Sequence, residues 1–220
     1  METMLKIAVV LSAYLLGSIP TSVWVGKIFY GIDVREHGSG NAGATNTIRV
    51  LGLIPGISVF IVDVLKGYLA VRLLYLTDFY IPKTGMFINF QLFLGIAALL
   101  GHIFPIFAQF RGGKGVAVLS GVVFALHPYA TLIVFGIWIV SVLITRYVSL
   151  SSMIAGFSFP LVLIFVYRTT NPSLITFAFI LAILMLFTHQ KNIERLVKGE
   201  ESKFSLKKKG KSSSQDNPKQ

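Results

Sequence analysis

Repeated long stretches with very few charges are the feature of this sequence that most constrains its fold. Apolar runs cover residues 5–28, 51–76, 86–108, 115–126, 129–146, 149–167 and 173–188. Helices of about 20 mainly apolar residues are long enough to cross the hydrocarbon core of a bilayer. Hydrophobic residues make up 54% of the 220 positions, more apolar surface than a soluble domain of this size can bury. The sequence therefore predicts an all-α, polytopic integral membrane protein with about seven transmembrane helices.

The lengths of the runs allow seven spans or five. The run at 115–126 is short and ends at His127-Pro128, so it either turns tightly there or forms a bent helix pair with the next run. The first run continues past Gly17 without a small-residue cleavage site, which favours a retained helix over a signal peptide. Both counts are odd and place the two termini on opposite sides of the membrane.

The basic residues between the runs predict the orientation of the chain. With the N-terminus outside, the outer side holds only Lys6, Arg72, Lys83 and Arg168. The inner side then holds Lys27, Arg35, Arg49, Arg111, Lys114, Arg146 and the basic residues from Lys191 to Lys219. Because loops rich in Lys and Arg remain on the cytoplasmic side, this distribution predicts an outer N-terminus and an inner C-terminus.

Composition excludes several kinds of chemistry. The sequence contains no cysteine, so it offers no thiol nucleophile, thiolate metal site or redox switch. Its His, Asp and Glu residues show no metal-ligand spacing, and we expect neither a metal nor a cofactor. In a membrane protein, the net charge of +11 indicates orientation and contact with anionic lipid rather than with nucleic acid. Residues 202–220 are expected to form a basic, disordered cytoplasmic tail after a membrane-embedded domain of residues 1–201.

Three polar segments adjoin the apolar runs and carry the candidate chemistry. The first polar segment is residues 36–49, the second is residues 111–115, and the third is residues 189–196. The predicted orientation places all three on the inner face of the membrane. We therefore expect them to form one site.

The first polar segment has the composition of an anion-binding loop. Gly38 and Gly40 let consecutive backbone N–H groups point into one concavity, and a following helix N-terminus adds positive potential. Side chains suited to phosphate oxygens or hydroxyls lie in the same segment: Ser39, Asn41, Thr45, Asn46 and Arg49. Residues 38–43 match G-x-G-x-x-G, but no strand precedes them, so a dinucleotide site is not indicated. A flexible linker before a capped helix is the alternative.

The second and third polar segments add charged and hydrogen-bonding groups. Lys114 stands among Gly112, Gly113 and Gly115, so a ligand can approach backbone N–H groups beside an ammonium. In the third segment, His189 and Asn192 lie three residues apart on one predicted helical face, with Arg195 three residues further. The alternatives are a basic turn at the membrane edge for the second segment and a juxtamembrane amphipathic helix for the third.

Two charged residues lie inside an apolar run. Asp63 and Lys66 would each cost about 2.5–3.5 kcal/mol if unpaired at the centre of the bilayer. We expect a mutual ion pair, and the lining of a polar cavity is the alternative. His102 is expected to be a buried packing residue rather than a metal ligand, and His127 a turn residue.

The three polar segments, in this order, resemble the bacterial acyl-phosphate-dependent glycerol-3-phosphate acyltransferase family, the PlsY family, over residues 5–201. The matching positions are Gly38, Ser39, Gly40, Asn41, Thr45, Asn46, Arg49, residues 111–115, His189, Asn192 and Arg195. Gln190 departs from the arginine that the family usually has there. The resemblance implies transfer of a fatty acyl group from acyl phosphate to the 1-hydroxyl of sn-glycerol 3-phosphate. The products are lysophosphatidic acid and phosphate, and the reaction is the first acylation of phospholipid biosynthesis.

The resemblance also implies roles for the site residues and a place in the cell. Ser39, Lys114 and the nearby glycine N–H groups are expected to bind the acyl-phosphate head, while Arg49, His189 and Asn192 orient glycerol 3-phosphate. Phosphate is a good leaving group, so direct attack needs no covalent enzyme intermediate. Either His189 or a phosphate oxygen of the substrate accepts the proton. The expected location is the bacterial plasma (inner) membrane, with the active site facing the cytoplasm.

Other features of the sequence bear on three alternatives to this predicted function. Glu194 stands where the H-x-x-x-x-D motif of acyl-CoA-dependent acyltransferases has Asp, so acyl phosphate rather than acyl-CoA is the expected donor. A small anion or lipid-precursor transporter would need a polar path through the membrane, for which only Asp63 and Lys66 are candidates. A membrane scaffold would leave the polar segments unexplained. The sequence indicates contact with membrane lipid and identifies no protein partner.

Overall fold

The computed structural model describes residues 1–204, and within them every regular element is a helix and none is a strand. The α-helices are α1 (Glu2–Ser18), α2 (Thr21–Tyr30), α3 (Ala44–Leu51), α4 (Leu53–Arg72), α5 (Gly85–Ile103), α6 (Val116–Leu126), α7 (Pro128–Thr145), α8 (Val148–Leu161), α9 (Pro172–Thr188) and α10 (Gln190–Val197). The short turns are η1 (Val34–Glu36), η2 (Leu73–Leu76), η3 (Ile106–Ala108) and the π-helical η4 (Val162–Val166). The all-α prediction is confirmed. The predicted tail beyond Phe204 lies outside the described residues.

Proline and capping side chains determine where helices begin and break. Pro20 interrupts the first apolar run, because proline lacks the N–H that a helix interior requires, and α1 and α2 meet there at 44°. His127 caps α7, since its Nδ1 accepts from the N–H of Ala130 at 3.3 Å. Its predicted position in a turn is thus confirmed. Asn171 caps α9 through the N–H of Leu174 at 3.1 Å.

The helices account for fewer complete spans than the number of apolar runs. Three stretches are long and apolar enough to cross a membrane, namely Gly85–Ala108, Pro128–Thr145 and Val148–Val166. The bent pairs α1 with α2 and α9 with α10 raise the count to five when each pair is one span. With 11 residues, α6 is only about 17 Å long and too short to span by itself. Length and composition thus support three to five spans in residues 1–204.

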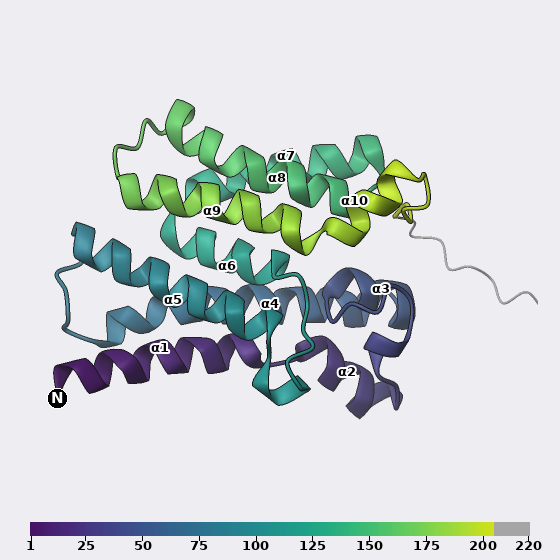
Figure 1. Ribbon diagram of the computed structural model, residues 1–220, viewed down its shortest axis with the longest axis horizontal. Helices are drawn as coiled ribbons and strands as arrows, with labels where there is room; N and C mark the ends of the chain where they lie inside the picture. Colours follow the sequence, from purple (N-terminus) through teal and green to yellow (C-terminus); the bar gives the residue numbers. More distant parts are fainter. Residues whose placement is uncertain (205–220) are drawn as a thin grey trace, which may run out of the picture.

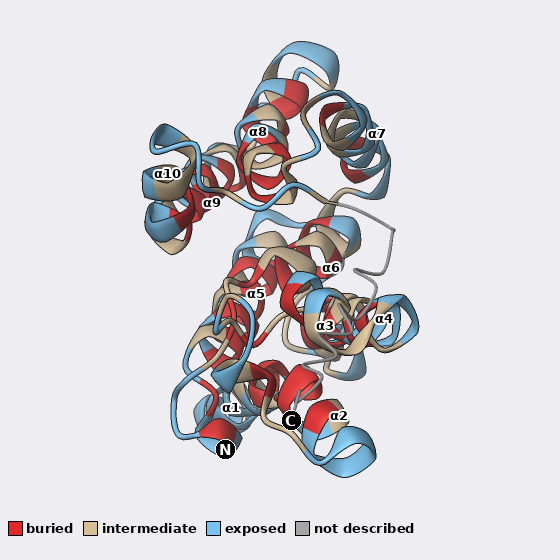
Figure 2. Cartoon of the chain, turned by 90° about the vertical axis from the view of Figure 1, so that its right-hand side faces the viewer, coloured by how far each residue is buried: buried red, intermediate tan, exposed pale blue. Residues whose placement is uncertain are grey.

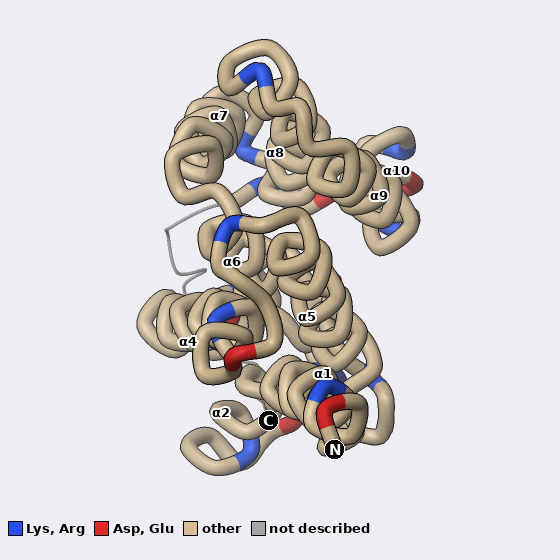
Figure 3. The backbone as a smooth tube through the Cα atoms, turned by 90° about the vertical axis from the view of Figure 1, so that its left-hand side faces the viewer, with Lys and Arg blue, Asp and Glu red and all other residues tan. Residues whose placement is uncertain are grey.

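The helices form an elongated bundle with two groups. Figure 1 shows α1, α4, α5, α6, α7, α8 and α9 running roughly along the long axis. Seen along that axis, α1–α6 form one group and α7–α10 lie beside it, with buried residues between neighbouring helices (Figure 2). Large apolar side chains such as Leu143 and Phe165 are exposed on the outside. Figure 3 shows that charged residues occupy only short lengths of the chain. Such an outer surface suits contact with lipid.

Glycines allow the closest helix contacts. A Cβ on Gly17 of α1 would overlap the carbonyl of Ala98 on α5, and one on Gly101 would overlap the carbonyl of Tyr14. Gly121 of α6 approaches the Val64 carbonyl of α4 equally closely. Small residues at helix crossings let backbones approach and increase van der Waals contact, which is the main source of helix association in lipid. These contacts join α1 to α5 and α4 to α6.

The charges within α4 form a closed buried cluster. Lys66 Nζ lies 2.8 Å from Asp63 Oδ1, and the two side chains are only 3% and 2% exposed. Lys66 also donates to the carbonyl of Ile19 at 2.7 Å, which lies at the break between α1 and α2. Thr21 Oγ1 donates to Asp63 at 3.0 Å. The predicted ion pair is confirmed, and it stabilises the break that Pro20 creates. His102 is buried beside it, as predicted, 3.9 Å from Asp63 Oδ1.

Candidate active site

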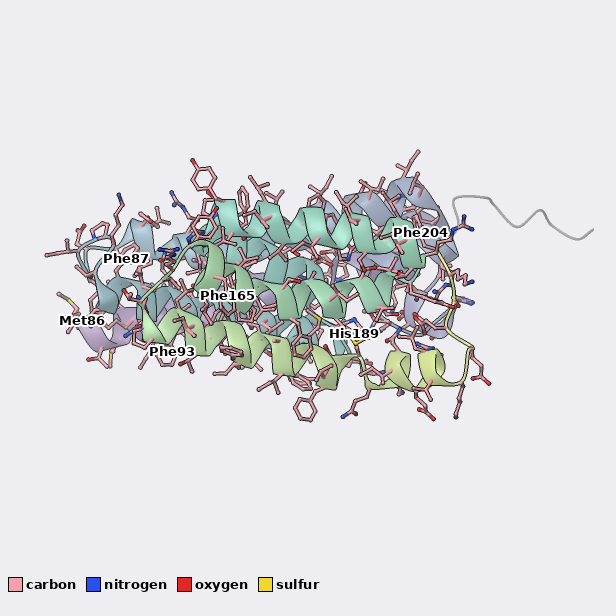
Figure 4. All side chains as sticks on the ribbon, turned by 90° about the horizontal axis from the view of Figure 1, so that it is seen from above. Met86, Phe87, Phe93, Phe165, His189 and Phe204 are labelled. Carbon is pink, nitrogen blue, oxygen red and sulfur yellow. The ribbon has the colours of Figure 1, made fainter. Side chains whose placement is uncertain are left out.

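The three polar segments meet at the end of the bundle that is opposite the N-terminus (Figure 1). Lys114 Nζ, in the second segment, donates a hydrogen bond to Asn192 Oδ1, in the third segment. The first and second segments also touch, because a Cβ on Gly113 would lie 2.8 Å from the Ala42 carbonyl oxygen. Figure 4 shows His189 toward this end, whereas Met86 and Phe87 lie at the other end. Segments that are far apart in the sequence thus surround one region.

The first segment is folded around Asn46. Its Oδ1 accepts from the backbone N–H and the hydroxyl of Ser39, at 2.8 and 3.1 Å. Its Nδ2 donates to the carbonyls of Val34 and His37, at 2.8 and 3.1 Å. Asn46 is 2% exposed, and all four of these hydrogen bonds are made within the loop. The substrate contact expected of Asn46 stays a prediction, and the structure adds a role in holding Ser39.

The remaining residues of the first segment are more accessible. Gly38 and Gly40 have positive φ, 63° and 72°, and form the turn that presents Ser39. Thr45 and Arg49 are both exposed on α3, four residues apart and therefore on one face. Asn41 is partly exposed. Thr45 and Arg49 therefore share one exposed face of α3, as the spacing predicted, and their contact with substrate stays a prediction.

The second segment turns closely against the end of α5. Gly112 and Gly113 donate their N–H groups to the carbonyls of Ile103 and His102, each at 3.2 Å. These two N–H groups are therefore occupied, although the sequence suggested that they face a ligand. A side chain on Gly113 would overlap the ring of His102, so glycine is required there by close approach. Gly115, with φ of 84°, then begins α6 directly after Lys114.

Lys114 lies among charged groups from all three regions. The pKa of its ammonium is lowered to about 8, chiefly by burial; Glu201 opposes this shift, while the charges of Arg195 and Arg49 add to it. An ammonium with that pKa is still mainly protonated at pH 7. Arg49 of the first segment and Arg195 of the third thus both contribute positive charge near Lys114. The site therefore concentrates positive charge, as binding of a phosphate group requires.

The third segment begins at a sharp bend. α9 and α10 meet at 60°, and His189 occupies the junction with 2% exposure. His189 Nδ1 lies 2.9 Å from the carbonyl of Met185. Since a carbonyl can only accept, this geometry assigns the proton of the neutral ring to Nδ1 and leaves Nε2 as an acceptor. The backbone N–H of Asn192 donates to the His189 carbonyl at 2.8 Å, which places both residues on the same turn.

Glu201 is a part of the cluster that the sequence did not reveal. Its carboxylate accepts from Asn192 Nδ2 at 2.7 Å, from Arg195 Nε at 3.0 Å and from Ser149 Oγ at 2.9 Å. Asn192 is thereby fixed at both ends of its amide, with Oδ1 toward Lys114 and Nδ2 toward Glu201. The sequence feature that could have indicated this role is an acidic residue just after a glycine. Gly199 has a φ of 72°, which lets the chain turn back from α10 and brings Glu201 to Asn192.

An apolar groove adjoins the third segment. It has a volume of about 500 Å³ and lies between α8, which contributes Met153, Ile154 and Phe157, and the α9–α10 corner. Leu186 and Ile193, three residues before and four after His189, line it from that corner. Within residues 1–204, no group of three or more His, Asp or Glu residues is arranged to hold a metal ion. The site therefore combines a cationic, hydrogen-bonding region with a neighbouring apolar surface.

Comparison with known proteins identifies the group to which this arrangement is similar. A family model described as glycerol-3-phosphate acyltransferase matches residues 7–199, which include all three polar segments. A glycerol-3-phosphate acyltransferase of Fusobacterium nucleatum is 42% identical over 193 residues, covering 88% of this chain and 95% of the relative. One from Chlorobaculum tepidum is 37% identical over 233 residues, covering 91% and 97%.

The fold is similar to that of a solved membrane enzyme. A crystal structure of PlsY (YgiH), an integral membrane glycerol 3-phosphate acyltransferase in its glycerol 3-phosphate form, matches with a TM-score of 0.79 and 38% sequence identity. The match covers 91% of this chain and 96% of that chain. The lysophosphatidic acid form of the same enzyme matches with a TM-score of 0.77.

Proposed function

The chain belongs to the glycerol-3-phosphate acyltransferase family and is an integral membrane acyltransferase, and from this premise we propose its donor, product and site residues. The donor is acyl phosphate, the acceptor is the 1-hydroxyl of sn-glycerol 3-phosphate, and the products are lysophosphatidic acid and phosphate. The observation that carries the proposal is the contact of Lys114 with Asn192 beside Arg49 and Arg195. This contact gathers three cations and a buried histidine at one end of the bundle, where two phosphate-bearing substrates can meet.

The donor phosphate binds at the second segment in this proposal. The Lys114 ammonium compensates the phosphate charge, and the first N–H groups of α6, which have no acceptor within their own helix, add positive potential. The Ser39 hydroxyl, oriented by Asn46, completes the contacts. Charge on the phosphate grows as it leaves, so these groups stabilise the transition state more than the bound substrate.

The acceptor binds between the first and third segments. Arg49 pairs with the phosphate of glycerol 3-phosphate, and Asn192 and His189 orient the attacking hydroxyl. That oxygen forms a bond to the acyl carbonyl carbon while the bond from this carbon to the phosphate oxygen breaks. The proton passes either to His189 Nε2 or to an oxygen of the leaving phosphate. The Nδ1 contact with the Met185 carbonyl supports the first route by leaving Nε2 unprotonated.

The acyl chain lies in the apolar groove beside His189. A fatty acyl group in the bilayer can enter from the side, and the groove faces outward between α8 and α9. This arrangement places the long apolar part of the donor in lipid and its phosphate in the cationic region. Burying the chain there requires no closed tunnel.

The orientation in the membrane is also part of the proposal. The N-terminus lies outside, and the end that carries α3 and α10 faces the cytoplasm of a bacterial inner membrane. The two bent pairs and the three long stretches give five spans; the proposed count of seven also includes α4 and α6, although α6, with 11 residues, is shorter than the bilayer is thick. Loops rich in Lys and Arg then lie inside.

Transport is the second candidate function, and one observation counts against it. Asp63 and Lys66, which were the only candidates for a polar path, are buried against each other and against Ile19 and Thr21. In the deciding experiment, purified protein receives labelled glycerol 3-phosphate together with one donor at a time: acyl phosphate, acyl-CoA or acylated acyl carrier protein. We expect labelled lysophosphatidic acid with acyl phosphate alone. Turnover with acyl-CoA as sole donor would contradict the donor, and uptake into vesicles without acylation would favour the transporter.

A further inference from the structure

The turn between α5 and α6 has an unusual backbone. Gln109 and Phe110 have positive φ, 56° and 58°, in the left-handed region that residues with a Cβ seldom adopt. Two such residues in succession persist only where surrounding contacts fix them. Lys114 follows four residues after Phe110. The conformation of this turn therefore determines where the second segment presents Lys114.

Arg35 contacts both sides of this turn. Its Nη1 donates to the carbonyl of Ala108 at 2.9 Å and to that of Arg111 at 3.3 Å, the two residues that flank the left-handed pair. The other edge of the guanidinium binds Asp33, with Nη2 to Oδ2 at 2.7 Å and Nε to Oδ1 at 3.0 Å. The side chains of Arg35 and Asp33 are only 10% and 9% exposed. A single ammonium could not make both sets of contacts, because they require the planar fork of arginine.

The same residues are tied to Ser39. Asp33 Oδ1 also accepts from the backbone N–H of Arg35 at 3.0 Å, which fixes η1. The Arg35 guanidinium holds the pKa of Asp33 well below its usual range, so this pair stays charged at physiological pH. Asn46 links η1 to Ser39, since it binds the Val34 carbonyl and the Ser39 hydroxyl. Hydrogen bonds thus run from Ser39 through η1 to the turn that precedes Lys114.

We infer that Arg35, held by Asp33, is a positioning residue for acyl transfer that fixes the turn at Gln109 and Phe110 and so sets the distance between Ser39 and Lys114. The inference rests on the proposed function, in which those two groups bind one phosphate. Arg35 itself contacts no substrate in this role. A site that is already rigid loses less entropy when the donor binds, and a shift of about 1 Å in a catalytic group can cost about 100-fold in rate.

The test compares Arg35→Gln with Lys27→Met. Lys27 also lies beside Asp33, at 3.3 Å, but it is 56% exposed, so its replacement controls for the loss of a cation near Asp33. We expect Arg35→Gln to lower kcat/KM for acyl phosphate about 10- to 100-fold and Lys27→Met to change it less than about twofold. At high pH, kcat/KM should fall as Lys114 loses its proton, and in Arg35→Gln this fall should move to higher pH. The reason is that a displaced loop leaves Lys114 less buried, which raises its pKa toward the ordinary value. Thermal unfolding of each variant is measured in parallel.

Further variants keep the inference testable if Arg35→Gln does not fold. Arg35→Lys should lose less activity than Arg35→Gln, and adding Gln109→Gly should restore part of it, because glycine adopts positive φ without strain. The inference is overturned if the Arg35 variants match Lys27→Met in kcat/KM, or if they lose only thermal stability and keep the wild-type alkaline limb. Absence of acyl transfer from acyl phosphate in the wild-type protein would overturn the proposed function instead.

Discussion

At the scale of single residues, the proposed site depends most on Lys114. Lys114→Met keeps a similar stem and removes the charge, so lost charge-assisted contacts of about 1.5–3 kcal/mol predict about 10- to over 100-fold slower turnover. Lys114→Arg keeps the charge, but its wider, planar group should restore activity only in part beside Gly113 and Gly115. Turnover is measured at matched membrane levels, with the exposed Lys191→Met as control. Near-normal rates in both Lys114 variants would remove this residue from the site.

The pH dependence of the reaction should report the same residue. With a pKa of about 8, Lys114 is charged below that pH and loses its charge as the pH rises through it. We therefore expect kcat/KM for acyl phosphate to fall on the alkaline side, by up to tenfold per pH unit above about pH 8. In Lys114→Arg the limb should disappear from this range, since a guanidinium stays protonated. Rates are measured between about pH 6.5 and 9.5, with uncatalysed hydrolysis of the donor subtracted. An identical limb in Lys114→Arg would assign it to another group.

The sequence predicted that these residues lie together, but it did not predict their hydrogen-bond partners. Lys114, His189 and Asn192 were selected by type and spacing, and the structure brings them together because all three segments follow helices that end on one side. Asn46 was expected to bind substrate, yet its amide is used within the loop. Glu201 was missed, since only the turn at Gly199 returns it to Asn192. Such partners depend on contacts between distant segments, which residue type alone does not encode.

At the scale of helices, the contact of α4 with α6 gives a stability prediction. A methyl group at Gly121 would overlap the Val64 carbonyl oxygen and lie 2.8 Å from the Tyr68 nitrogen, so the helices must separate. We expect Gly121→Ala to destabilise the protein by about 1–3 kcal/mol, as overpacking does elsewhere. Gly136→Ala on α7 is the matched control, because its Cβ meets nothing within 4 Å and alanine favours a helix by up to about 1 kcal/mol. Thermal unfolding in detergent checks both, and equal midpoints would contradict this account of the packing.

Apolar runs predicted which segments are helical and the turn at His127, but not the bends at Pro20 and His189. The run 5–28 contains Pro20 and becomes α1 and α2, while the third segment leaves α9 at 60° to become α10. Both bends are accompanied by tertiary hydrogen bonds, including that of Lys66 with Ile19, which no local pattern specifies. The domain boundary predicted at residue 201 was likewise set by composition. The structure continues the packed chain at least to Phe204, whose N–H donates to the Arg146 carbonyl at 2.7 Å.

At the scale of the whole molecule, the position of the site at one end makes the orientation in the membrane testable. The chain has no cysteine, so single cysteines can be introduced and labelled without background. Asp78 lies in the exposed connection before α5, and Lys198 is exposed after α10, at opposite ends of the bundle (Figure 1). If the basic loops face the cytoplasm, Asp78→Cys should react with a membrane-impermeant maleimide in intact cells.

Lys198→Cys should react with the same reagent only after the cells are permeabilised. As a control, acyl transfer is measured for both variants, so that labelling is compared only in functional protein. We expect the cationic end to face the cytoplasm because the two substrates reach the site from different places. Glycerol 3-phosphate is water-soluble and charged, so it reaches a site that opens to the compartment containing it, whereas in the proposed reaction the acyl chain arrives through the bilayer. Labelling of Lys198→Cys in intact cells would place the cationic end outside and contradict the orientation predicted from the basic residues. Glycerol 3-phosphate would then have to reach the site from outside the cell.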